Sequence, residues 1–197
     1  MTVLLNNHPQ DVTQEEFEKD LLLLPEWRQK KALRFRFLLD RVLCAKAYLL
    51  LKQGLSSTFG ITDNPEFLYI GHDKPVLKDC PDIHFNLSHC KRGVLCVIDR
   101  QDIGCDIEEI MQQLDMDLCR HCFSESEFTD IFSSPSPCTQ FTVWWTRKEA
   151  YLKLTGMGLI DNLPTLFTTE VMKKIKFETT VDEDHGYVYT ICTYLCS

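Results

Sequence analysis

The 197-residue sequence lacks any hydrophobic run long enough to cross a membrane. Its nearest approach is the four leucines at 21–24, whereas a membrane helix needs about 20 consecutive apolar residues. The N-terminal stretch MTVLLNNHPQDV also lacks the basic start and apolar core of a signal peptide. We therefore expect a cytoplasmic protein without membrane association, and a hydrophobic content of 44% is enough to build a folded core.

Positive charge is also scarce. The chain carries 21 Lys and Arg against 29 Asp and Glu, a net charge of −8, which argues against a general nucleic-acid binder. The charge is unevenly distributed, since residues 26–53 hold eight basic side chains and two acidic ones, whereas residues 102–130 hold nine acidic side chains and one Arg. The first region predicts an anion site and the second a cation site.

Paired cysteines with useful spacing are missing, although the chain has ten cysteines. Cys119 and Cys122 form one CxxC, but a structural zinc site needs a second pair. Four of the others lie within apolar stretches, as small core residues do: Cys44, Cys96, Cys105 and Cys192. We expect neither a disulfide framework nor a zinc site.

Hydrophobic periodicity predicts a mixture of helices and strands. Helices are expected over 26–53, 112–130 and 139–154; strands over 66–71 and 103–108; hairpins from 84–89 with 93–99 and from 175–181 with 187–195; and a loop over 133–138. Pro25 and Gly54 bound the first helix, while Ser124 with Glu127 forms a capping box.

The pattern indicates an α+β protein. Each half of the chain contains a long helix, strands and a hairpin, and the two hairpins lie roughly 90 residues apart. This spacing is compatible with an internal duplication, but an ordinary α+β chain can repeat such elements as well.

The acidic strand at 103–108 is the first candidate site. Strand alternation sends Gly104, Asp106 and Glu108 to one face, with the two carboxylates roughly 7 Å apart. Mg²⁺ commonly takes one or two carboxylates together with phosphate oxygens, and the glycine leaves room for a ligand to approach the backbone. The alternative is a solvated edge strand with two ordinary acids.

The helix within WWTRKEAYLKLTGMGL, residues 144–159, is the second candidate. Glu149 and Lys153 are spaced i, i+4 and share a face, so they form either a surface ion pair or a carboxylate and an ammonium beside a phosphate.

Ser88 and His89 are adjacent in a strand and point to opposite faces, so they cannot act as nucleophile and base. No GxSxG sequence is present either.

Taken in order, the segments KPVL, FNLSH, IGCDIE, FSESEF and WWTRKEAYLKLTGMGL resemble the surfactin-type 4′-phosphopantetheinyl transferases over about residues 25–160. The resemblance implies an α+β fold built as a pseudo-twofold pair of similar halves, each a long helix packed on a small antiparallel sheet. Residues 1–101 would form the N-terminal half, on the nucleotide side of coenzyme A. Residues 102–197 would form the C-terminal half, with the metal site and the carrier-protein side.

The resemblance also implies roles for single residues. The ligands of Mg²⁺, with Mn²⁺ as the alternative ion, would be Asp106, Glu108 and Glu149. The contacts to coenzyme A would come from Lys31 (or Lys30 beside it), Arg41, Lys74, Ser88, His89 and Lys153. Catalysis would then depend on Glu149 as the base, on Lys153 as a point charge at the pyrophosphate, and on Asp106 through the metal.

The implied reaction moves the 4′-phosphopantetheine arm of coenzyme A to a serine of an acyl or peptidyl carrier protein and releases adenosine 3′,5′-bisphosphate. The carrier would serve fatty acid, polyketide or nonribosomal peptide synthesis, and the enzyme would act as a monomer. Two alternatives remain open: a non-catalytic module of the same fold that binds coenzyme A or carrier protein, and a Mg²⁺-dependent phosphodiesterase.

Overall fold

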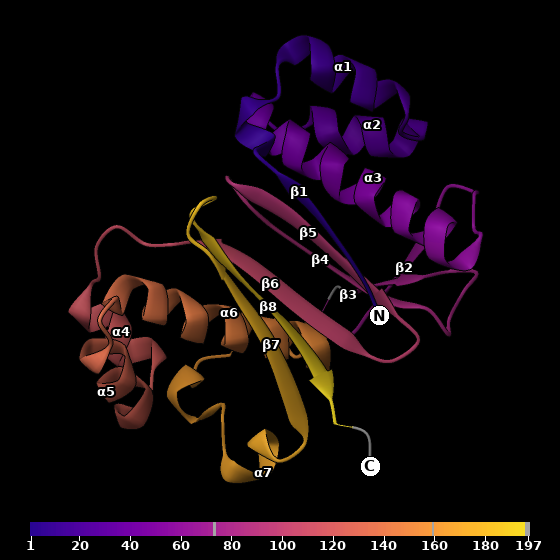
Figure 1. Cartoon of the computed structure of the whole chain (residues 1–197). Coiled ribbons are helices and arrows are strands. Elements are labelled where there is room, and N and C mark those ends of the chain that lie inside the picture. Colours follow the sequence, from indigo (N-terminus) through magenta and orange to yellow (C-terminus); the bar gives the residue numbers. More distant parts are fainter. Residues whose placement is uncertain (73, 159, 196–197) are drawn as a thin grey trace.

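The computed structural model describes residues 1–72, 74–158 and 160–195, arranged as in Figure 1. Its strands are β1 (Thr2–Asn7), β2 (Phe67–Ile70), β3 (Lys74–Leu77), β4 (His84–Cys90), β5 (Gly93–Asp99), β6 (Ile103–Glu109), β7 (Ile175–Asp182) and β8 (Tyr187–Tyr194). Its α-helices are α1 (Gln14–Leu22), α2 (Glu26–Leu33), α3 (Leu38–Phe59), α4 (Met116–Cys122), α5 (Glu125–Ser133), α6 (Pro137–Thr155) and α7 (Thr169–Met172). Short 3₁₀ turns lie at Pro9–Asp11 and Leu163–Thr165.

Two three-stranded antiparallel sheets organise the molecule. The first has the strand order β1-β5-β4 and the second β6-β8-β7, while β2 and β3 pair separately. The long helix α3 packs on the first sheet, where Leu51 and Leu55 meet Ile98, and α6 packs on the second, where Ala150 and Leu154 meet other buried side chains. The mixed α+β class with small antiparallel sheets, each covered by a long helix, is confirmed (Figure 1).

The two sheets join through the inner face of β6. Ile103, Cys105 and Ile107 are fully buried in one cluster with Leu95 and Val97 of β5. The alternation predicted for this strand is therefore confirmed, since these three side chains share one face while Asp106 and Glu108 lie on the other. The apolar face of β6 joins the N-terminal and C-terminal parts of the chain in one core.

Gly104 has a different role from the one expected. A Cβ atom at this position would collide with the carbonyl oxygen of Ala150 and the backbone nitrogen of Leu154 on α6. The room that this glycine provides is therefore filled by the helix and not by a ligand. The close contact holds α6 directly against β6, so it fixes the distance between two elements that carry acidic candidates.

The helix expected over 26–53 is wrong as a single element. The chain leaves the helix at 34–37, and α3 begins after Phe37, whose backbone is extended. The break is required because α2 folds back on α3: buried Arg28 of α2 donates to the carbonyl of Cys44, 3.0 Å away. Gly54 lies inside α3. The helix ends at Phe59, and its C-cap is Gly60, which has a left-handed backbone conformation (φ 70°).

The helix expected over 112–130 also consists of two elements. Ser124 caps α5, and its capping box with Glu127 is present as predicted. An N-cap residue must have a non-helical backbone, and Ser124 has φ −66° and ψ 163°. The predicted cap therefore ends the preceding helix, α4, before Phe123, whose ring packs in a T-shaped contact on Phe141.

Both hairpins were correctly predicted, as β4–β5 and β7–β8, and so was the helix at 139–154, which corresponds to α6. The N-terminal strand β1, which pairs with β5, was not anticipated, and neither were α1 and β3. Every described cysteine carries a free thiol.

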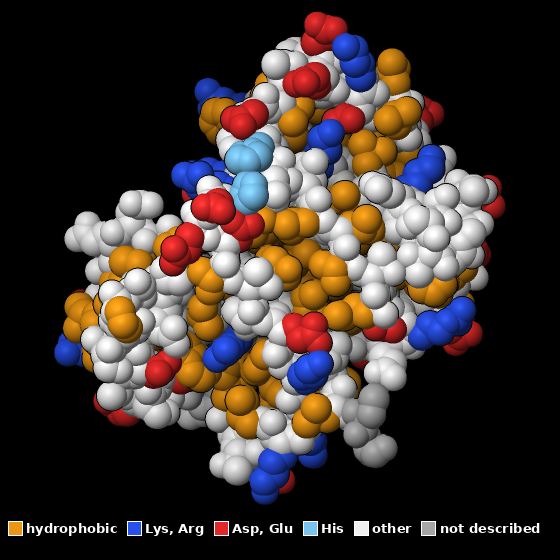
Figure 2. Space-filling view, in the orientation of Figure 1, with side chains coloured by type: hydrophobic (Ala, Val, Ile, Leu, Met, Phe, Trp, Pro, Cys, Tyr) orange, Lys and Arg blue, Asp and Glu red, His pale blue; other side chains and the backbone are white. Residues whose placement is uncertain are grey.

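On the face shown in Figure 2, basic and acidic side chains are interspersed around exposed hydrophobic groups. Among the described residues, no helix combines the length and apolar character needed to span a bilayer.

Candidate functional site

Three predicted site residues meet where β4, β6 and α6 converge. The hydroxyl of Ser88 donates to Oδ1 of Asp106 at 2.7 Å, and the ammonium of Lys153 lies 2.6 Å from the same oxygen. The ammonium also donates to Oγ of Ser88 at 2.9 Å. These residues are far apart in the sequence, so the tertiary fold brings them together.

Asp106 is a buried carboxylate with an incomplete set of partners. Only 2% of the residue is exposed, and its Oδ2 atom has no hydrogen-bond partner among the described residues. An unpaired buried carboxylate oxygen is costly. Such an atom is best explained by a cation or donor that binds there.

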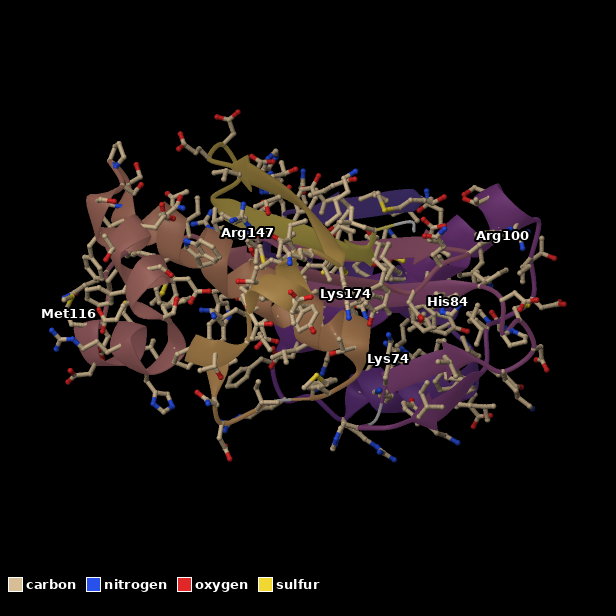
Figure 3. All side chains as sticks on the ribbon, turned by 90° about the horizontal axis from the view of Figure 1, so that it is seen from below. Lys74, His84, Arg100, Met116, Arg147 and Lys174 are labelled. Carbon is tan, nitrogen blue, oxygen red and sulfur yellow. The ribbon has the colours of Figure 1, made fainter. Side chains whose placement is uncertain are left out.

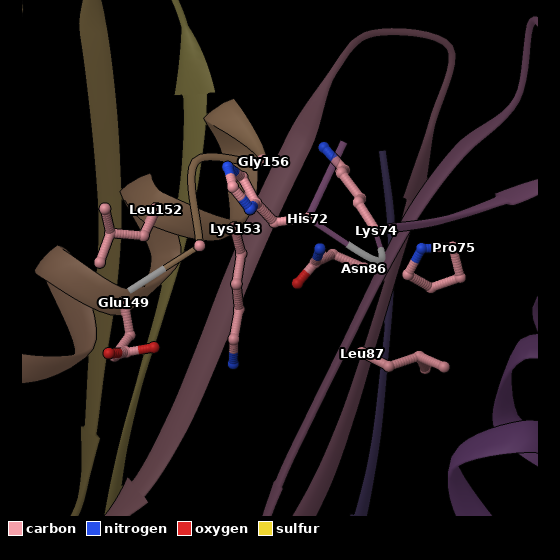
Figure 4. A pocket seen from close by; sticks show the side chains of 10 residues that line it. His72, Lys74, Pro75, Asn86, Leu87, Glu149, Leu152, Lys153 and Gly156 are labelled. Atoms are coloured by element: carbon pink, nitrogen blue, oxygen red, sulfur yellow. The ribbon is translucent and has the colours of Figure 1, made fainter. Parts of the chain in front are cut away.

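A cavity of about 320 Å³ opens beside Lys153. Figure 4 shows Lys153 and Glu149 on the α6 side and Asn86 on the facing side, from β4. The lining residues are His72, Lys74, Pro75, Asn86, Leu87, Glu149, Leu152, Lys153, Gly156 and Gly158. Lys74 and Lys153 both line this cavity, and lysine side chains are suited to binding an anion such as a phosphate.

Lys74 ties the N-terminal part of the chain to the end of α6. Its ammonium donates to the carbonyl of Leu154 at 2.9 Å, and burial lowers its pKa. Figure 3 shows Lys74 beside the end of α6, far from Met116 on α4. Gly156 ends the helix in a left-handed conformation (φ 68°), and a Cβ atom there would lie 3.5 Å from the Lys74 side chain. The left-handed backbone, which favours glycine, therefore ends α6 within contact distance of Lys74.

Glu108 and Glu149 place more negative potential near Asp106. Burial and then the charge of Asp106 raise the pKa of Glu108 to about 7, although Lys153 and a hydrogen bond from Trp145 act in the opposite sense. The pKa of Glu149 is raised by the same two causes, burial first. Two buried glutamates whose pKa values are raised by a neighbouring carboxylate indicate a site short of positive charge.

The pKa of Lys153 reflects the opposite balance. Burial is the largest single influence and would lower it, but the charge and hydrogen bond of Asp106, together with the charges of other neighbours such as Glu149, raise the pKa above its usual value. Lys153 is therefore a fully charged ammonium at neutral pH, held between a buried carboxylate and the cavity.

The donor set fits a hard divalent cation. Within the described residues, no three Asp, Glu, His or Cys side chains are close enough, as they stand, to enclose a metal ion. Even so, Asp106 has a buried oxygen without a partner, and Glu108 and Glu149 have raised pKa values. Oxygen ligands of this kind suit Mg²⁺, which needs few protein ligands and keeps several waters.

The remaining predicted residues are placed less centrally. His89 is exposed on the strand face opposite to Ser88. Burial and then the charge of Lys153 lower its pKa, whereas the charges of Asp40 and Asp106 act in the opposite sense. Arg41 lies in the first turn of α3, where its Nε donates to the carbonyl of Phe35 at 2.8 Å. Lys31 is exposed on α2, and its ammonium has no ion pair in the described part of the chain. The structure thus gathers Ser88, Asp106 and Lys153 and leaves Arg41 and Lys31 apart from them.

Two supporting residues were missed from the sequence. Lys148 is fully buried and bonds Glu127 at 3.0 Å and the carbonyl of Leu163 at 2.9 Å, so it holds α5 against α6. Asn86 accepts a hydrogen bond from the backbone N–H of Cys105 at 3.1 Å. The only available signals were a lysine next to the motif glutamate and an asparagine inside a strand, where this residue type is uncommon.

Comparison with known proteins identifies the family. Residues 102–192 match the model of the 4′-phosphopantetheinyl transferase superfamily. A 4′-phosphopantetheinyl transferase of Bacillus subtilis is 31% identical over 168 residues, covering 79% of this chain and 70% of that protein. The 4′-phosphopantetheinyl transferase psf-1 of Bacillus pumilus is 33% identical over 135 residues, which cover 67% of this chain and 58% of that protein.

A third relative matches over a longer stretch. The 4′-phosphopantetheinyl transferase Sfp of Bacillus subtilis (strain 168) is 26% identical over 195 residues, covering 92% of this chain and 87% of that protein. Together with the converging Ser88, Asp106 and Lys153, these likenesses lead to one conclusion. The chain belongs to the 4′-phosphopantetheinyl transferase superfamily.

Proposed function

We propose that this protein transfers the 4′-phosphopantetheine arm of coenzyme A to a serine hydroxyl of an acyl or peptidyl carrier protein and releases adenosine 3′,5′-bisphosphate. One observation carries the proposal: the buried carboxylate of Asp106 bonds the hydroxyl of Ser88 and the ammonium of Lys153. Lys153 in turn lines a cavity together with a second lysine, Lys74. Family membership supplies the reaction, and this arrangement supplies groups suited to a pyrophosphate and its cation.

The residues that would hold the cation are Asp106, Glu108 and Glu149. Mg²⁺, or Mn²⁺ in its place, would neutralise charge on the pyrophosphate oxygens. This assignment rests on the unpartnered Oδ2 of Asp106 and on the raised pKa values of the two glutamates. A bound cation would relieve the repulsion among all three carboxylates.

In the reaction, the carrier serine oxygen forms a bond to the β-phosphorus, and the bond from that phosphorus to the bridging oxygen breaks. The leaving adenosine 3′,5′-bisphosphate keeps the bridging oxygen. We assign the serine proton to Glu149, a carboxylate that lines the cavity and whose pKa is raised by burial. Lys153 contributes a fixed positive charge beside the pyrophosphate, and positioning of this kind supplies most of the catalysis in phosphoryl transfer.

We assign the phosphates of coenzyme A to Lys74, Lys153, Ser88 and His89. Lys74 and Lys153 line the cavity, and the hydroxyl of Ser88 accepts a hydrogen bond from the ammonium of Lys153. Arg41 and Lys31 would reach the nucleotide end of a long ligand, because they lie on α3 and α2, in the N-terminal part of the chain. Coenzyme A would thus extend from the C-terminal sheet toward the basic helices.

We infer that the chain consists of two related halves that meet near residue 102. In support, each half has a strand, a long helix and a hairpin, and in each sheet the last strand of the half lies between the other two (β1-β5-β4 and β6-β8-β7). The cavity takes lining residues from both halves. Because one chain supplies both sides, we propose that the protein acts as a monomer.

A non-catalytic binding module of the same fold is the main alternative, and a Mg²⁺-dependent phosphodiesterase is the second. A module that only binds would not need all three carboxylates together with Lys153, and this chain has the complete set. We propose that the carrier belongs to fatty acid, polyketide or nonribosomal peptide synthesis, as expected from the resemblance.

Intact-mass spectrometry tests the proposed function. The protein is incubated with Mg²⁺, coenzyme A and several apo carrier proteins, and a carrier heavier by one phosphopantetheine group is the expected product. Unchanged carrier masses across the whole panel would refute the transferase. Coenzyme A consumed without any carrier present would support the phosphodiesterase instead.

A further inference from the structure

Lys153 and Asp106 form an ion pair with one buried and one accessible member. The ammonium and Oδ1 are 2.6 Å apart, and the exposed fractions of the two side chains are 31% and 2%. The pair therefore lies at the boundary between the protein interior and the cavity. Its accessible member, Lys153, is also the one that lines the cavity.

The ammonium of Lys153 already neutralises the carboxylate to which a cation would bind. Asp106 has one negative charge, and Lys153 neutralises it directly. A divalent ion approaching Oδ2 would meet this ammonium only a few ångströms away, and repulsion at that range in a partly buried site is strong. The Lys153 ammonium and the divalent ion therefore weaken each other's binding to the Asp106 carboxylate.

Lys153 has few other anions to hold it in place. Its ammonium has three donor hydrogens, and the described residues accept two hydrogen bonds from it, at Asp106 Oδ1 and Ser88 Oγ. Glu149, one helical turn earlier, acts on Lys153 only through its charge. An anionic group in the cavity would therefore be an alternative partner for the ammonium.

We propose that Lys153 is the resident counter-ion of Asp106 in the metal-free protein, and that it competes with a divalent cation for this carboxylate. When the cation binds, the charge of Lys153 becomes available to an anion in the cavity. When an anion occupies the cavity, Lys153 is drawn from Asp106 and the cation binds more tightly. The ion pair thus couples cation binding to anion binding.

This inference rests on the proposed cation site but not on the transfer reaction. It assigns Lys153 two successive partners, Asp106 and then an anion, where the proposed function uses only the second. It also explains how a carboxylate with 2% exposure is tolerated before any metal arrives, because a buried charge needs a counter-charge nearby.

Direct measurement of Mn²⁺ affinity without coenzyme A tests the competition. Free Mn²⁺ is followed by electron paramagnetic resonance for the wild type, Lys153→Met, Lys153→Arg and the exposed control Lys173→Met. We expect Lys153→Met to bind Mn²⁺ at least about tenfold more tightly than the wild type, because the competing charge is gone. Lys153→Arg keeps the charge and should stay near the wild type, as should Lys173→Met.

Thermal unfolding gives a second readout that does not involve catalysis. Metal-free Lys153→Met should melt below the wild type, because Asp106 is left buried and unpaired. Saturating Mn²⁺ should raise its melting temperature more than that of the wild type, since ligand stabilisation grows with affinity. If Lys153→Met does not fold, Lys153→Gln is used, because its amide can still donate to Asp106 without carrying charge.

The outcomes separate this inference from the proposed function. Equal or weaker Mn²⁺ affinity in a folded Lys153→Met or Lys153→Gln variant would overturn the competition, whatever the wild type does with a carrier protein. A tenfold gain in Mn²⁺ affinity with no transfer by the wild type would support the competition and refute the transferase. No Mn²⁺ binding to any variant would overturn both the cation site and this inference.

Discussion

The side-chain oxygen of Asn86 accepts a hydrogen bond from the backbone N–H of Cys105 at 3.1 Å, so a side chain of β4 satisfies a backbone group of β6. β8 pairs with the other side of β6. The amide of Asn86 also lines the cavity. One buried asparagine therefore links the two sheets next to the residue, Asp106, on which the candidate site is centred.

Replacing Asn86 with alanine should loosen this junction. The Cys105 N–H would be left buried without an acceptor, and we expect a loss of about 1–3 kcal/mol in the free energy of unfolding. Urea denaturation followed by circular dichroism would measure it. The control is Asn64→Ala in an exposed loop, where a change within about 0.5 kcal/mol is expected. Equal effects at both sites would contradict a special role for Asn86.

Lys148 and Glu127 should behave as a coupled pair. Lys148→Met leaves the Glu127 carboxylate buried without its cation, and losing one member of a buried ion pair costs about 3–5 kcal/mol. The double variant Lys148→Met/Glu127→Gln should lose less than the first substitution alone, because no buried charge remains. A double-mutant cycle by chemical denaturation measures this coupling. Strict additivity of the two single changes would show that the pair contributes no coupling.

The exposed pair Lys173–Glu170 provides the matched comparison. Its ammonium and carboxylate are 2.9 Å apart but largely exposed. Surface pairs of this kind contribute about 0–1 kcal/mol, so Lys173→Met should change stability very little.

Glu108 should make the metal-free protein less stable as the pH rises. Its pKa in the folded protein is about 7, above the ordinary value of 4.5, so between these values the folded state binds more protons than the unfolded state. Stability therefore falls as the pH rises through this window, and the full cost is present above about pH 7. Glu108→Gln should be more stable than the wild type at pH 8 by on the order of 1–2 kcal/mol, after allowance for solvent screening.

Urea titrations at several pH values, in the presence of a chelator, would measure this difference. It should vanish near pH 4, where the carboxyl group is protonated in both states. A Gln variant less stable than the wild type at pH 8 would contradict the raised pKa. With a divalent cation present, the order should reverse, since ionised Glu108 is then a proposed ligand.

Asp106→Ala and Glu149→Ala should each abolish transfer while the protein remains folded. The first removes the central proposed cation ligand and the second the proposed base, so we expect a loss of at least about a hundredfold in rate. Mass spectrometry of the carrier measures turnover, and circular dichroism checks the fold. The control Asp184→Ala changes an exposed acid in the β7–β8 turn. Undiminished turnover in either site variant would refute the corresponding role.

Local patterns in the sequence predicted the strands around the site and the faces they present. The alternation from Ile103 to Glu108 gave both the buried face and the acidic face, and the hairpins followed from their turn residues. Helix boundaries failed where tertiary packing breaks a continuous apolar pattern. Residues 26–53 are split because α2 must fold back on α3, and no periodicity in the sequence marks that reversal.

The partners of charged groups were the least predictable part of the site. Spacing paired Lys153 with Glu149 on one helix face, but the ammonium bonds Asp106, 47 residues away. Lys148, beside it in sequence, is fully buried against Glu127. Which neighbour a lysine selects depends on distances between elements, and here the close approach of α6 to Gly104 sets those distances.

The core that joins the sheets also has a consequence for synthesis on the ribosome. Leu95 and Val97 of β5 are buried by β6 and by Tyr187 and Ile191 of β8. The N-terminal sheet is made first, so its apolar face stays partly uncovered until β8, which completes the cluster, has been translated. Nascent chains expose such surfaces to aggregation or to chaperones. This protein should therefore complete its fold late, in a step that forms the shared core and the cavity beside Lys153 together.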